Sequence, residues 1–373
     1  MAVKGKPRIL IIENSLDFTG GLNSVLRSSE QLRDRFDFCF LLPSTSQSIR
    51  YLKEKGFVVY ELPMKEIRKT AGSMLVYFPF LFINSIRLSN LVKKTGIELI
   101  VSNDFYNLMP LLYRLIGGDV PYFCYVRFLP SRFPTWLVRG WFSLHARHAR
   151  KIFAVSEKVK SELPPHPKVV VLYDGMVSEK TNVTWNENSR TILYLANYIP
   201  GKGQQYALQS FAHIQNEFPD WILRFVGGDM GLEKNRQFRQ TLVELSKNLG
   251  CERQIEWCNF SQDIRQEFEH AAIVLNFSDS ESFSLTTLEA LFYGRPVIAT
   301  DSGGPSEIID RDESGIIIPT GNISSMAGAM RRLMSDPRER HRMGSFGRQR
   351  VVERFGYEQT FERLRDHYES VLE

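Results

Sequence analysis

Hydrophobic and polar residues alternate along the chain in a pattern that predicts short buried strands separated by helices. Arg8–Ile12 is an apolar run typical of a buried strand, and residues 22–33 repeat apolar side chains at helical spacing. The alternation continues through the N-terminal half. Further strands are expected at residues 36–42, 57–61, 99–103, 122–126, 152–155 and 169–173. Such alternation predicts a parallel sheet covered by helices on both faces.

A polar stretch at residues 181–189 interrupts this pattern, and we interpret it as a linker between domains. The alternation then restarts. Strands are expected at residues 191–196, 222–227, 255–257, 273–277, 296–300 and 315–318, and helices at 204–217, 233–249, 338–355 and 357–373. Two successive α/β halves without a sequence repeat predict two Rossmann-like domains that share a cleft, over residues 1–180 and 189–355.

The two halves of the chain differ in charge. The 373 residues carry a net charge of +5, but residues 1–180 hold 26 Lys and Arg against 15 Asp and Glu, whereas residues 181–373 hold 21 against 27. A basic half indicates an anionic partner, either a phosphate-bearing acceptor or an acidic lipid surface. A solvated basic face explains the same charge. Nucleic acid is not expected, because no nucleic-acid-binding motif accompanies the charge.

The cysteines and the apolar segments bear on cellular location. Four cysteines form no CxxC pair, so we expect reduced thiols in a cytoplasmic protein. No apolar run is long enough to span a membrane. The apolar stretch at residues 74–86 indicates either a peripheral contact with an anionic membrane, at its inner face, or a buried helix. Basic residues flank this stretch on both sides: Lys65, Arg68, Lys69, Lys93 and Lys94.

The segment at residues 278–300 carries the most informative chemistry. A strand is expected to end at Phe277, a polar loop contains Glu281, and a helix begins near Ser284 and stops at Gly294. The first amides of a helix lack intrahelical partners and lie at the positive end of its dipole. A phosphate can therefore bind at the start of this helix, whose first residues are Ser284, Leu285 and Thr286.

Two carboxylates flank this phosphate position. Glu281 precedes the helix, and Glu289 lies eight residues further along the chain, roughly 12 Å at the rise of a helix. One acceptor on each side of a diphosphate suits a ligand with a sugar at one end and a ribose at the other. Two carboxylates at this spacing alone are usually a solvated helix face.

The segment resembles the E-x7-E signature of retaining glycosyltransferase family four, the glycosyl transferases group 1, which have the GT-B fold. The likeness continues through residues 300–307 and 314–319. The resemblance implies two Rossmann-like domains that face each other across a cleft, and we expect the C-terminal helix, about 357–373, to pack back on the N-terminal domain. It also implies that Glu281 binds donor-sugar hydroxyls, that Glu289 binds the ribose, and that the helix amides hold the diphosphate.

A second signature, at residues 193–203, is similar to the family's Gly-Arg…Lys-Gly loop. Lys202 matches the lysine that neutralises the diphosphate as the bond to the sugar breaks, and Gly203 follows it. Asn197 stands where the family has an arginine, so one cation is missing from this loop. A Gly-Lys-Gly segment by itself can also be a flexible turn.

The N-terminal half resembles the family only in outline. Gly20-Gly21 follows the first strand, where it would touch the phosphates or the acceptor, although a plain tight turn explains it equally. Arg127 occupies a position where the family commonly has a histidine. It is interpreted as a ligand of an anionic acceptor, as the missing phosphate cation, or as a surface arginine. His145 and His148 are expected at the surface.

The resemblance implies a retaining, metal-independent glycosyltransferase. No metal motif is present, and no cofactor is expected apart from the donor, a nucleotide-diphosphate sugar. The acceptor is expected to be a saccharide or a lipid-linked saccharide, in cell-surface polysaccharide or lipopolysaccharide assembly. A non-hydrolysing nucleotide-sugar epimerase and a non-catalytic binding protein are the alternatives. A nicotinamide dehydrogenase is disfavoured because no GxGxxG motif follows the first strand of either domain.

Overall fold

A computed structural model describes residues 5–64, 71–177, 186–261 and 263–372, with the backbone alone for residues 71–76. The chain divides into two compact units. One unit comprises Met1–Gly175 together with Glu358–Glu373, and the other comprises Met176–Tyr357. Most of the linker expected at residues 181–189 lies outside the described residues. None of the helices in the described part of the chain has the length and apolar character to cross a membrane.

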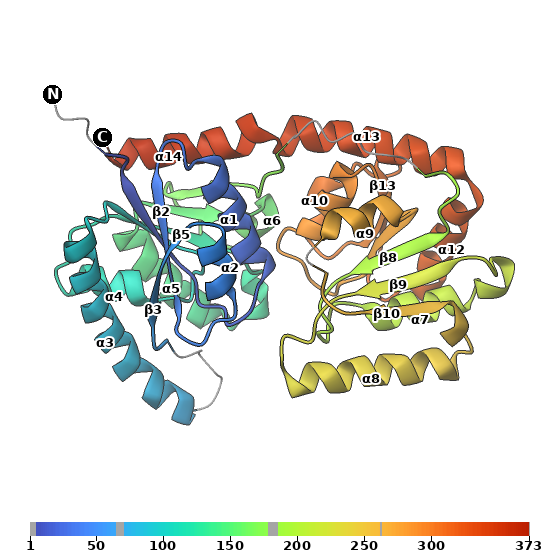
Figure 1. Ribbon diagram of the computed structural model, residues 1–373, viewed down its shortest axis with the longest axis horizontal. Coiled ribbons are helices and arrows are strands. Elements are labelled where there is room, and N and C mark those ends of the chain that lie inside the picture. The colour runs from blue at the N-terminus through green and yellow to red at the C-terminus, as the bar shows by residue number, and fades with distance from the viewer. Residues whose placement is uncertain (1–4, 65–70, 178–185, 262, 373) are drawn as a thin grey trace. The chain divides into compact units, whose positions relative to one another are not determined.

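The N-terminal unit contains a seven-stranded sheet in the order β3-β2-β1-β4-β5-β6-β7, and all neighbouring strands are parallel (Figure 1). Its strands are β1 Arg8–Ile12, β2 Asp37–Pro43, β3 Val58–Leu62, β4 Leu99–Ser102, β5 Tyr122–Val126, β6 Lys151–Ala154 and β7 Val169–Val171. Its helices are α1 Gly20–Gln31, α2 Ser48–Glu54, α3 Ala71–Thr95, α4 Met109–Leu115, α5 Thr135–His148, α6 Glu157–Ser161 and α14 Arg363–Leu372, with a π-helical turn at Glu358–Glu362.

The handedness of the connections decides which helices cover which face of this sheet. The strand order runs outward from β1 to β3, then returns to β4 and runs outward on the other side. Because parallel crossovers are right-handed, α1 and α2 lie on one face, and α3, α4 and α5 lie on the other. The C-terminal helix α14 also belongs to this unit, as the sequence predicts. The ring of Tyr368 on α14 stacks on Phe123 of β5, with the ring centroids 5.9 Å apart.

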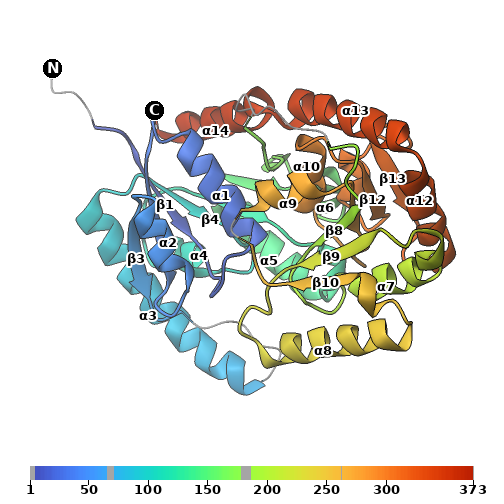
Figure 2. The same cartoon turned by 45° about the vertical axis from the view of Figure 1, so that its right-hand side comes forward.

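The C-terminal unit repeats this plan with a six-stranded parallel sheet in the order β10-β9-β8-β11-β12-β13 (Figure 2). Its strands are β8 Thr191–Leu195, β9 Ile222–Val226, β10 Ile255–Cys258, β11 Ile273–Asn276, β12 Val297–Thr300 and β13 Gly315–Ile318. Its helices are α7 Gln204–Ala212, α8 Glu233–Asn248, α9 Ile264–His270, α10 Leu285–Phe292, α11 Pro305–Ile308, α12 Ile323–Ser335 and α13 Pro337–Phe355. The fold is therefore the two-sheet α/β architecture expected from the sequence.

Three local features differ from the sequence-based expectations. Gly20 and Gly21 are not a turn before a helix but the first residues of α1, because the Thr19 hydroxyl accepts a hydrogen bond from the Leu22 amide at 3.2 Å and caps the helix. Helices α4, α9, α11 and α12 were not among the expected elements. The expectation that His145 lies at the surface is wrong, since this residue is fully buried.

His145 is buried because α5 turns it toward the sheet, where both ring nitrogens have partners. Its Nε2 lies 2.8 Å from the Phe105 carbonyl oxygen, which accepts only, so Nε2 carries the proton. Its Nδ1 then accepts from the Tyr122 hydroxyl at 3.1 Å. Burial lowers the pKa of His145 to about 4. The neutral ring is therefore part of the folded state near neutral pH.

This burial predicts a pH-dependent contribution to stability. Between pH 6.5 and about pH 4 an unfolded chain takes up a proton at residue 145 that the folded chain does not bind. The contribution is present above pH 6.5, and it falls as the pH drops, by at most about 1.4 kcal/mol per pH unit. We expect the melting temperature of the wild-type protein to decrease more steeply on acidification than that of His145→Gln. Parallel pH profiles of the two proteins would contradict this interpretation.

Candidate functional site

The candidate site lies at the carboxyl ends of β8 and β11, neighbouring strands in the middle of the C-terminal sheet. From β8 the strand order runs outward in one direction to β10, and from β11 in the other direction to β13. The loops that follow two such strands diverge, and open α/β sheets bind ligands at this point. We name the two segments here the lysine loop, residues 196–203, and the glutamate loop, residues 277–284.

One buried hydroxyl group joins these two loops. The Tyr194 hydroxyl accepts a hydrogen bond from the Phe277 amide at 2.9 Å and donates to the Lys202 carbonyl oxygen. Burial raises the pKa of Tyr194, so the hydroxyl keeps its proton and can donate. A second link runs from the Asp279 amide to the Gly201 carbonyl oxygen at 2.9 Å. The two loops are therefore fixed to each other at their backbones.

Gly203 allows the loops to approach this closely. Its φ is 80°, a left-handed conformation that favours glycine. A Cβ atom at this position would lie 2.0 Å from the Phe277 carbonyl oxygen. Any side chain at residue 203 would therefore push the loops apart, so Gly203 has a structural role here, and its role in donor binding stays a prediction.

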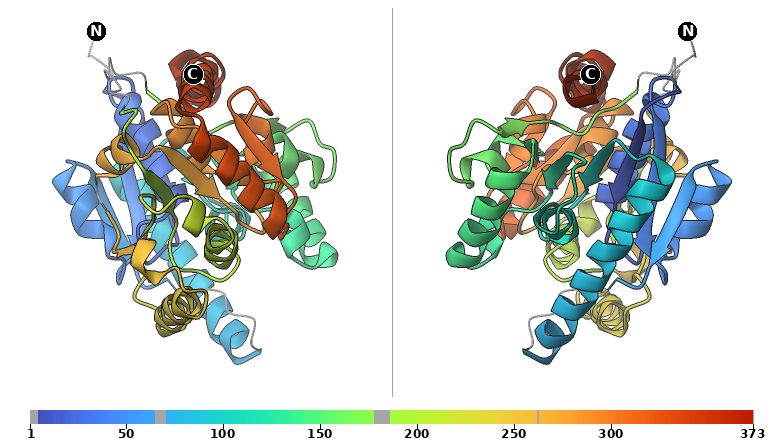
Figure 3. Two further views of the ribbon diagram at one scale, coloured as in Figure 1. Left: turned by 90° about the vertical axis from the view of Figure 1, so that its right-hand side faces the viewer. Right: turned by 90° about the vertical axis from the view of Figure 1, so that its left-hand side faces the viewer.

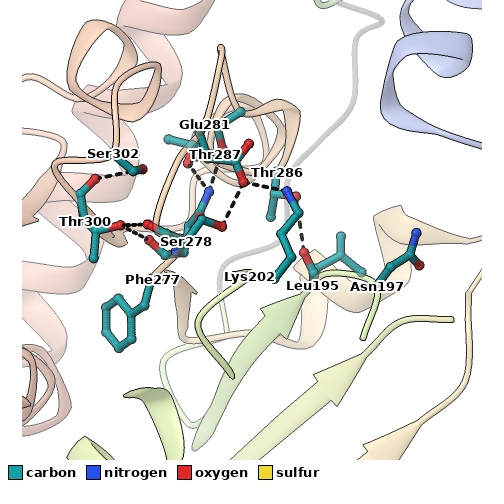
Figure 4. Close-up of polar contacts among 12 residues, drawn as sticks. Leu195, Asn197, Lys202, Phe277, Ser278, Glu281, Thr286, Thr287, Thr300 and Ser302 are labelled. Atoms are coloured by element: carbon teal, nitrogen blue, oxygen red, sulfur yellow. Dashed lines mark hydrogen bonds and ion pairs between the residues drawn. The ribbon is translucent and has the colours of Figure 1, made fainter. Parts of the chain in front are cut away.

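The closeness of the loops brings Lys202 and Glu281 together (Figure 4). The Lys202 Nζ atom lies 2.8 Å from the Glu281 Oε1 atom, and their side chains are 33% and 15% exposed. The Ser278 hydroxyl also donates to Glu281 Oε1 at 2.8 Å. The backbone of Glu281 is held in place, because its amide donates to Ser302 and its carbonyl accepts from Gly304, both at 2.9 Å. The site thus presents a partly exposed ammonium group beside an oriented carboxylate.

Helix α10 begins directly after the glutamate loop. Ser284 is its N-cap and adopts φ 89°, and the Ser284 hydroxyl accepts from the Thr287 amide at 3.3 Å. The Asn276 side chain at the end of β11 donates to the same hydroxyl at 2.7 Å. The amides of Leu285 and Thr286 precede the first intrahelical hydrogen bonds, so a helix of this kind offers them to an anion.

The structure brings most of the predicted donor residues to this edge of the sheet. Lys202 and Glu281 are in contact, and Ser284, Leu285 and Thr286 form the start of α10. Thr286 is anchored through its hydroxyl, which donates to the Leu195 carbonyl oxygen at the end of β8 at 3.2 Å. Glu289 lies further along α10 and is only 4% exposed.

Asn197 connects the lysine loop to the next loop of the sheet. Its side-chain oxygen accepts from the Gly228 amide at 3.0 Å, and its carbonyl accepts from the Gln204 side chain at 2.9 Å. Asn197, at the position where the resemblance predicts an arginine, thus holds the backbone of the two loops in place. The sequence analysis missed Tyr194 and Ser278, because a tyrosine inside a strand and a serine in a polar loop have no distinctive pattern.

Arg127 is the centre of a separate polar cluster in the N-terminal unit. Its guanidinium pairs with Asp174 at 3.0 Å, and its Nε donates to Asn103 at 2.7 Å. The Arg127 and Asp174 side chains are only 9% and 7% exposed, so the interpretation of a surface arginine is wrong. Burial lowers the pKa of Arg127, but the opposing effects of Asp174, Tyr125 and Asp104 together raise it overall.

Gly21 and two polar residues complete this cluster. A Cβ atom at Gly21 would lie 3.1 Å from the Arg127 Cδ atom, so the start of α1 rests on the arginine side chain. Asn103 donates in turn to the buried carboxylate of Glu13, which follows β1. Glu13, Asn103 and Asp174 were not predicted, since nothing in their local sequence indicates that they meet.

Comparisons with known proteins agree with this geometry. Residues 178–350 match the family described as Glycosyl transferases group 1. N-acetyl-alpha-D-glucosaminyl L-malate synthase from Bacillus anthracis is 27% identical over 187 residues, which are 50% of this chain and 47% of that protein. An exopolysaccharide phosphotransferase from Streptomyces coelicolor is 33% identical over 149 residues, which are 39% of this chain and 15% of that protein. The chain thus matches less than half the length of each of these two curated relatives.

A solved structure extends the likeness of fold to nearly the whole chain. The crystal structure of Anabaena Alr3699/HepE in complex with UDP-glucose has a TM-score of 0.82 and 18% identity, and the match covers 97% of this chain and 99% of that one. At this identity the likeness concerns the fold. Together with the sequence match over residues 178–350, it leads to one conclusion. The C-terminal half of the chain belongs to the glycosyl transferases group 1 family.

Proposed function

We propose that the chain is a retaining glycosyltransferase that moves a sugar from a nucleotide-diphosphate sugar to a saccharide or a lipid-linked saccharide. We place it in cell-surface polysaccharide or lipopolysaccharide assembly, in the cytoplasm or at the inner face of the membrane. One observation carries the proposal. The ammonium group of Lys202 lies 2.8 Å from the Glu281 carboxylate, and the helix that begins just after Glu281 offers its first amides at the same edge of the sheet.

The leaving group explains the need for Lys202. When the bond between the anomeric carbon and the phosphate oxygen breaks, that oxygen gains negative charge. A lysine ammonium group and the amides of Leu285 and Thr286 can stabilise this charge without moving far, because both loops are fixed by Tyr194. In the retaining mechanism that we propose, the departing phosphate accepts the proton of the attacking acceptor hydroxyl.

Glu281 suits the sugar end of the donor. Its Oε1 atom already accepts from Lys202 and Ser278, so its carboxylate has a fixed orientation and retains acceptor capacity for sugar hydroxyls. We assign the ribose to Glu289 on the family pattern. Since Glu289 is 4% exposed, it would reach a ribose through few accessible atoms.

The relatives support a nucleotide sugar as donor. Anabaena Alr3699/HepE was solved with UDP-glucose, and the Bacillus anthracis relative is named for a glucosaminyl product. We therefore propose a screen of nucleotide sugars, beginning with UDP-glucose, by thermal stabilisation. A donor at 100 times its dissociation constant adds about 2.7 kcal/mol to the free energy of unfolding.

Lys202→Met and Glu281→Gln are expected to lower the rate of donor turnover by about 10²–10³-fold, the usual effect of losing one preorganised charged group. The measurement is transfer, or slow donor hydrolysis where no acceptor is known, with melting curves to check the fold. Lys247→Met and Glu244→Gln, which change exposed residues of α8, serve as matched controls. Near-normal turnover in either site variant would remove that residue from the proposed mechanism.

We propose that the reaction needs no metal ion. Lys202 and the amides of α10 would then carry the charge stabilisation that a divalent cation supplies in other transferases. After treatment with EDTA, the rate of donor turnover is expected to stay within about twofold of the untreated rate, because protein groups alone would stabilise the leaving group. A loss of activity that magnesium or manganese restores would refute this proposal.

Arg127→Ala is expected to reduce the free energy of unfolding by about 3–5 kcal/mol, because it leaves the buried Asp174 carboxylate without its partner. Denaturant unfolding measures this change, with the exposed Arg35→Ala as control. Adding Asp174→Ala should recover part of the loss. If Arg127 instead supplies the missing donor-site cation, Asn197→Arg in the Arg127→Ala background would restore turnover, and stability would change little.

A further inference from the structure

Helix α3 exposes apolar side chains where a surface helix normally exposes polar ones. Its exposed positions recur at helical spacing and include Phe78, Phe82, Ile83 and Ile86, with exposed fractions of 56%, 50%, 45% and 42%. The opposite side of α3 buries Tyr77, Leu81 and Leu88 together with the polar residues Asn84 and Ser85. Contact with water alone would favour polar side chains at the exposed positions. Within the expected 74–86 segment, the apolar residues from 77 to 86 are thus divided between the two sides of a helix, instead of forming a wholly buried one.

Helix α5, which covers the same face of the N-terminal sheet as α3, also exposes apolar side chains. Trp136 is 73% exposed and Leu144 is 42% exposed, and the exposed arginines Arg139 and Arg147 lie at helical spacing between and beyond them. Tryptophan combines an apolar body with a polar N–H group and is enriched at membrane–water interfaces. A single exposed residue would need no explanation, but this one continues a stripe along the helix.

The short helix α4 joins α3 and α5, because it packs against both of them (Figure 3). Leu115 and Ile116 at its end are 55% and 39% exposed. Of the twelve large hydrophobic residues that are exposed in the described part of the chain, eight therefore lie on α3, α4 and α5 or directly after α4. We name the exposed residues of these helices, together with Ile116, the three-helix surface. Such a concentration marks an interaction surface.

The charge of the three-helix surface restricts what can bind it. The sequences of α3, α4 and α5 contain no Asp or Glu. Their Lys and Arg residues are Arg87, Lys93, Lys94, Arg114, Arg139 and Arg147. A second copy of the chain that met this surface through its own three-helix surface would bring equal positive charge and be repelled. A partner must therefore accept apolar side chains and carry negative charge.

We propose that the three-helix surface docks on a lipid bilayer that contains anionic headgroups. Phe78, Phe82 and Trp136 would enter the boundary between headgroups and acyl chains, and the arginines would meet lipid phosphates. Apolar and basic residues on one helical face are the combination that binds such interfaces. The inference deepens the proposed function, since it rests on a lipid-linked acceptor as the reason for membrane binding, and it assigns the contact to particular residues.

Co-sedimentation of the full chain with lipid vesicles tests the proposal. Binding is expected to vesicles of phosphatidylcholine mixed with phosphatidylglycerol and to be much weaker with phosphatidylcholine alone. Arg139→Ser with Arg147→Ser is expected to weaken binding by about 30-fold, from the usual contribution of a basic residue near an anionic surface. Phe78→Ser with Phe82→Ser is expected to weaken it on the order of 100-fold, from the lost burial of two aromatic rings.

Matched variants elsewhere on the chain control for charge and hydrophobicity. Arg35→Ser with Arg50→Ser removes the same charge, and Val58→Ser with Leu232→Ser removes exposed apolar side chains. Both controls should bind vesicles like the wild type. Equal losses in the controls, binding to both lipid mixtures alike, or self-association through Phe82 without vesicle binding would each overturn the proposal. Thermal stabilisation by a nucleotide sugar tests the proposed donor site separately. If a nucleotide sugar stabilises the protein but vesicles do not bind it, only the inference of membrane docking is rejected.

Discussion

The two hydrogen bonds of the Tyr194 hydroxyl are the interaction on which the geometry of the proposed donor site depends. It accepts from the glutamate loop and donates to the lysine loop, so one oxygen atom sets the separation of Lys202 and Glu281. Its cost is the burial of a polar group, which the two hydrogen bonds offset. Because neither loop has regular secondary structure, this link and the close approach at Gly203 replace the rigidity that a strand would supply.

The two units use charge in opposite ways at the carboxyl edges of their sheets. In the C-terminal unit the Lys202–Glu281 pair is partly exposed, so a ligand can replace one partner at little desolvation cost. In the N-terminal unit the Arg127–Asp174 pair is almost fully buried, and removing either partner leaves an uncompensated charge. The partly exposed pair can exchange partners with a ligand, whereas the buried pair holds its segments in one arrangement. The same type of sheet edge thus carries a partly exposed ion pair in one unit and a buried ion pair in the other.

Sequence patterns predicted the fold and the strand–loop–helix structure around Glu281 because their signals are local. The strand–loop–helix run from β11 to β12 contains its own cap at Ser284 and its own stop at Gly294, so the position of Glu281 follows from neighbouring residues. Arg127 could not be placed in this way, since its partner Asp174 is 47 residues away along the chain. For α3, helical periodicity indicates a helix, but it does not indicate which of its two apolar sides packs against the rest of the unit. The roles of the individual site residues stay predictions.

The conformation of Ser284 has a consequence for how the site assembles. A serine rarely adopts φ 89°, and this backbone is strained in isolation. It is held by Asn276 at the end of β11 and by Thr287 within α10, so neither segment supplies the restraint alone. The turn at the start of α10 therefore depends on both β11 and α10 for its conformation. If this turn binds the donor as proposed, partial opening of β11 would weaken that binding before the rest of the unit unfolds, and nucleotide binding would then report local unfolding.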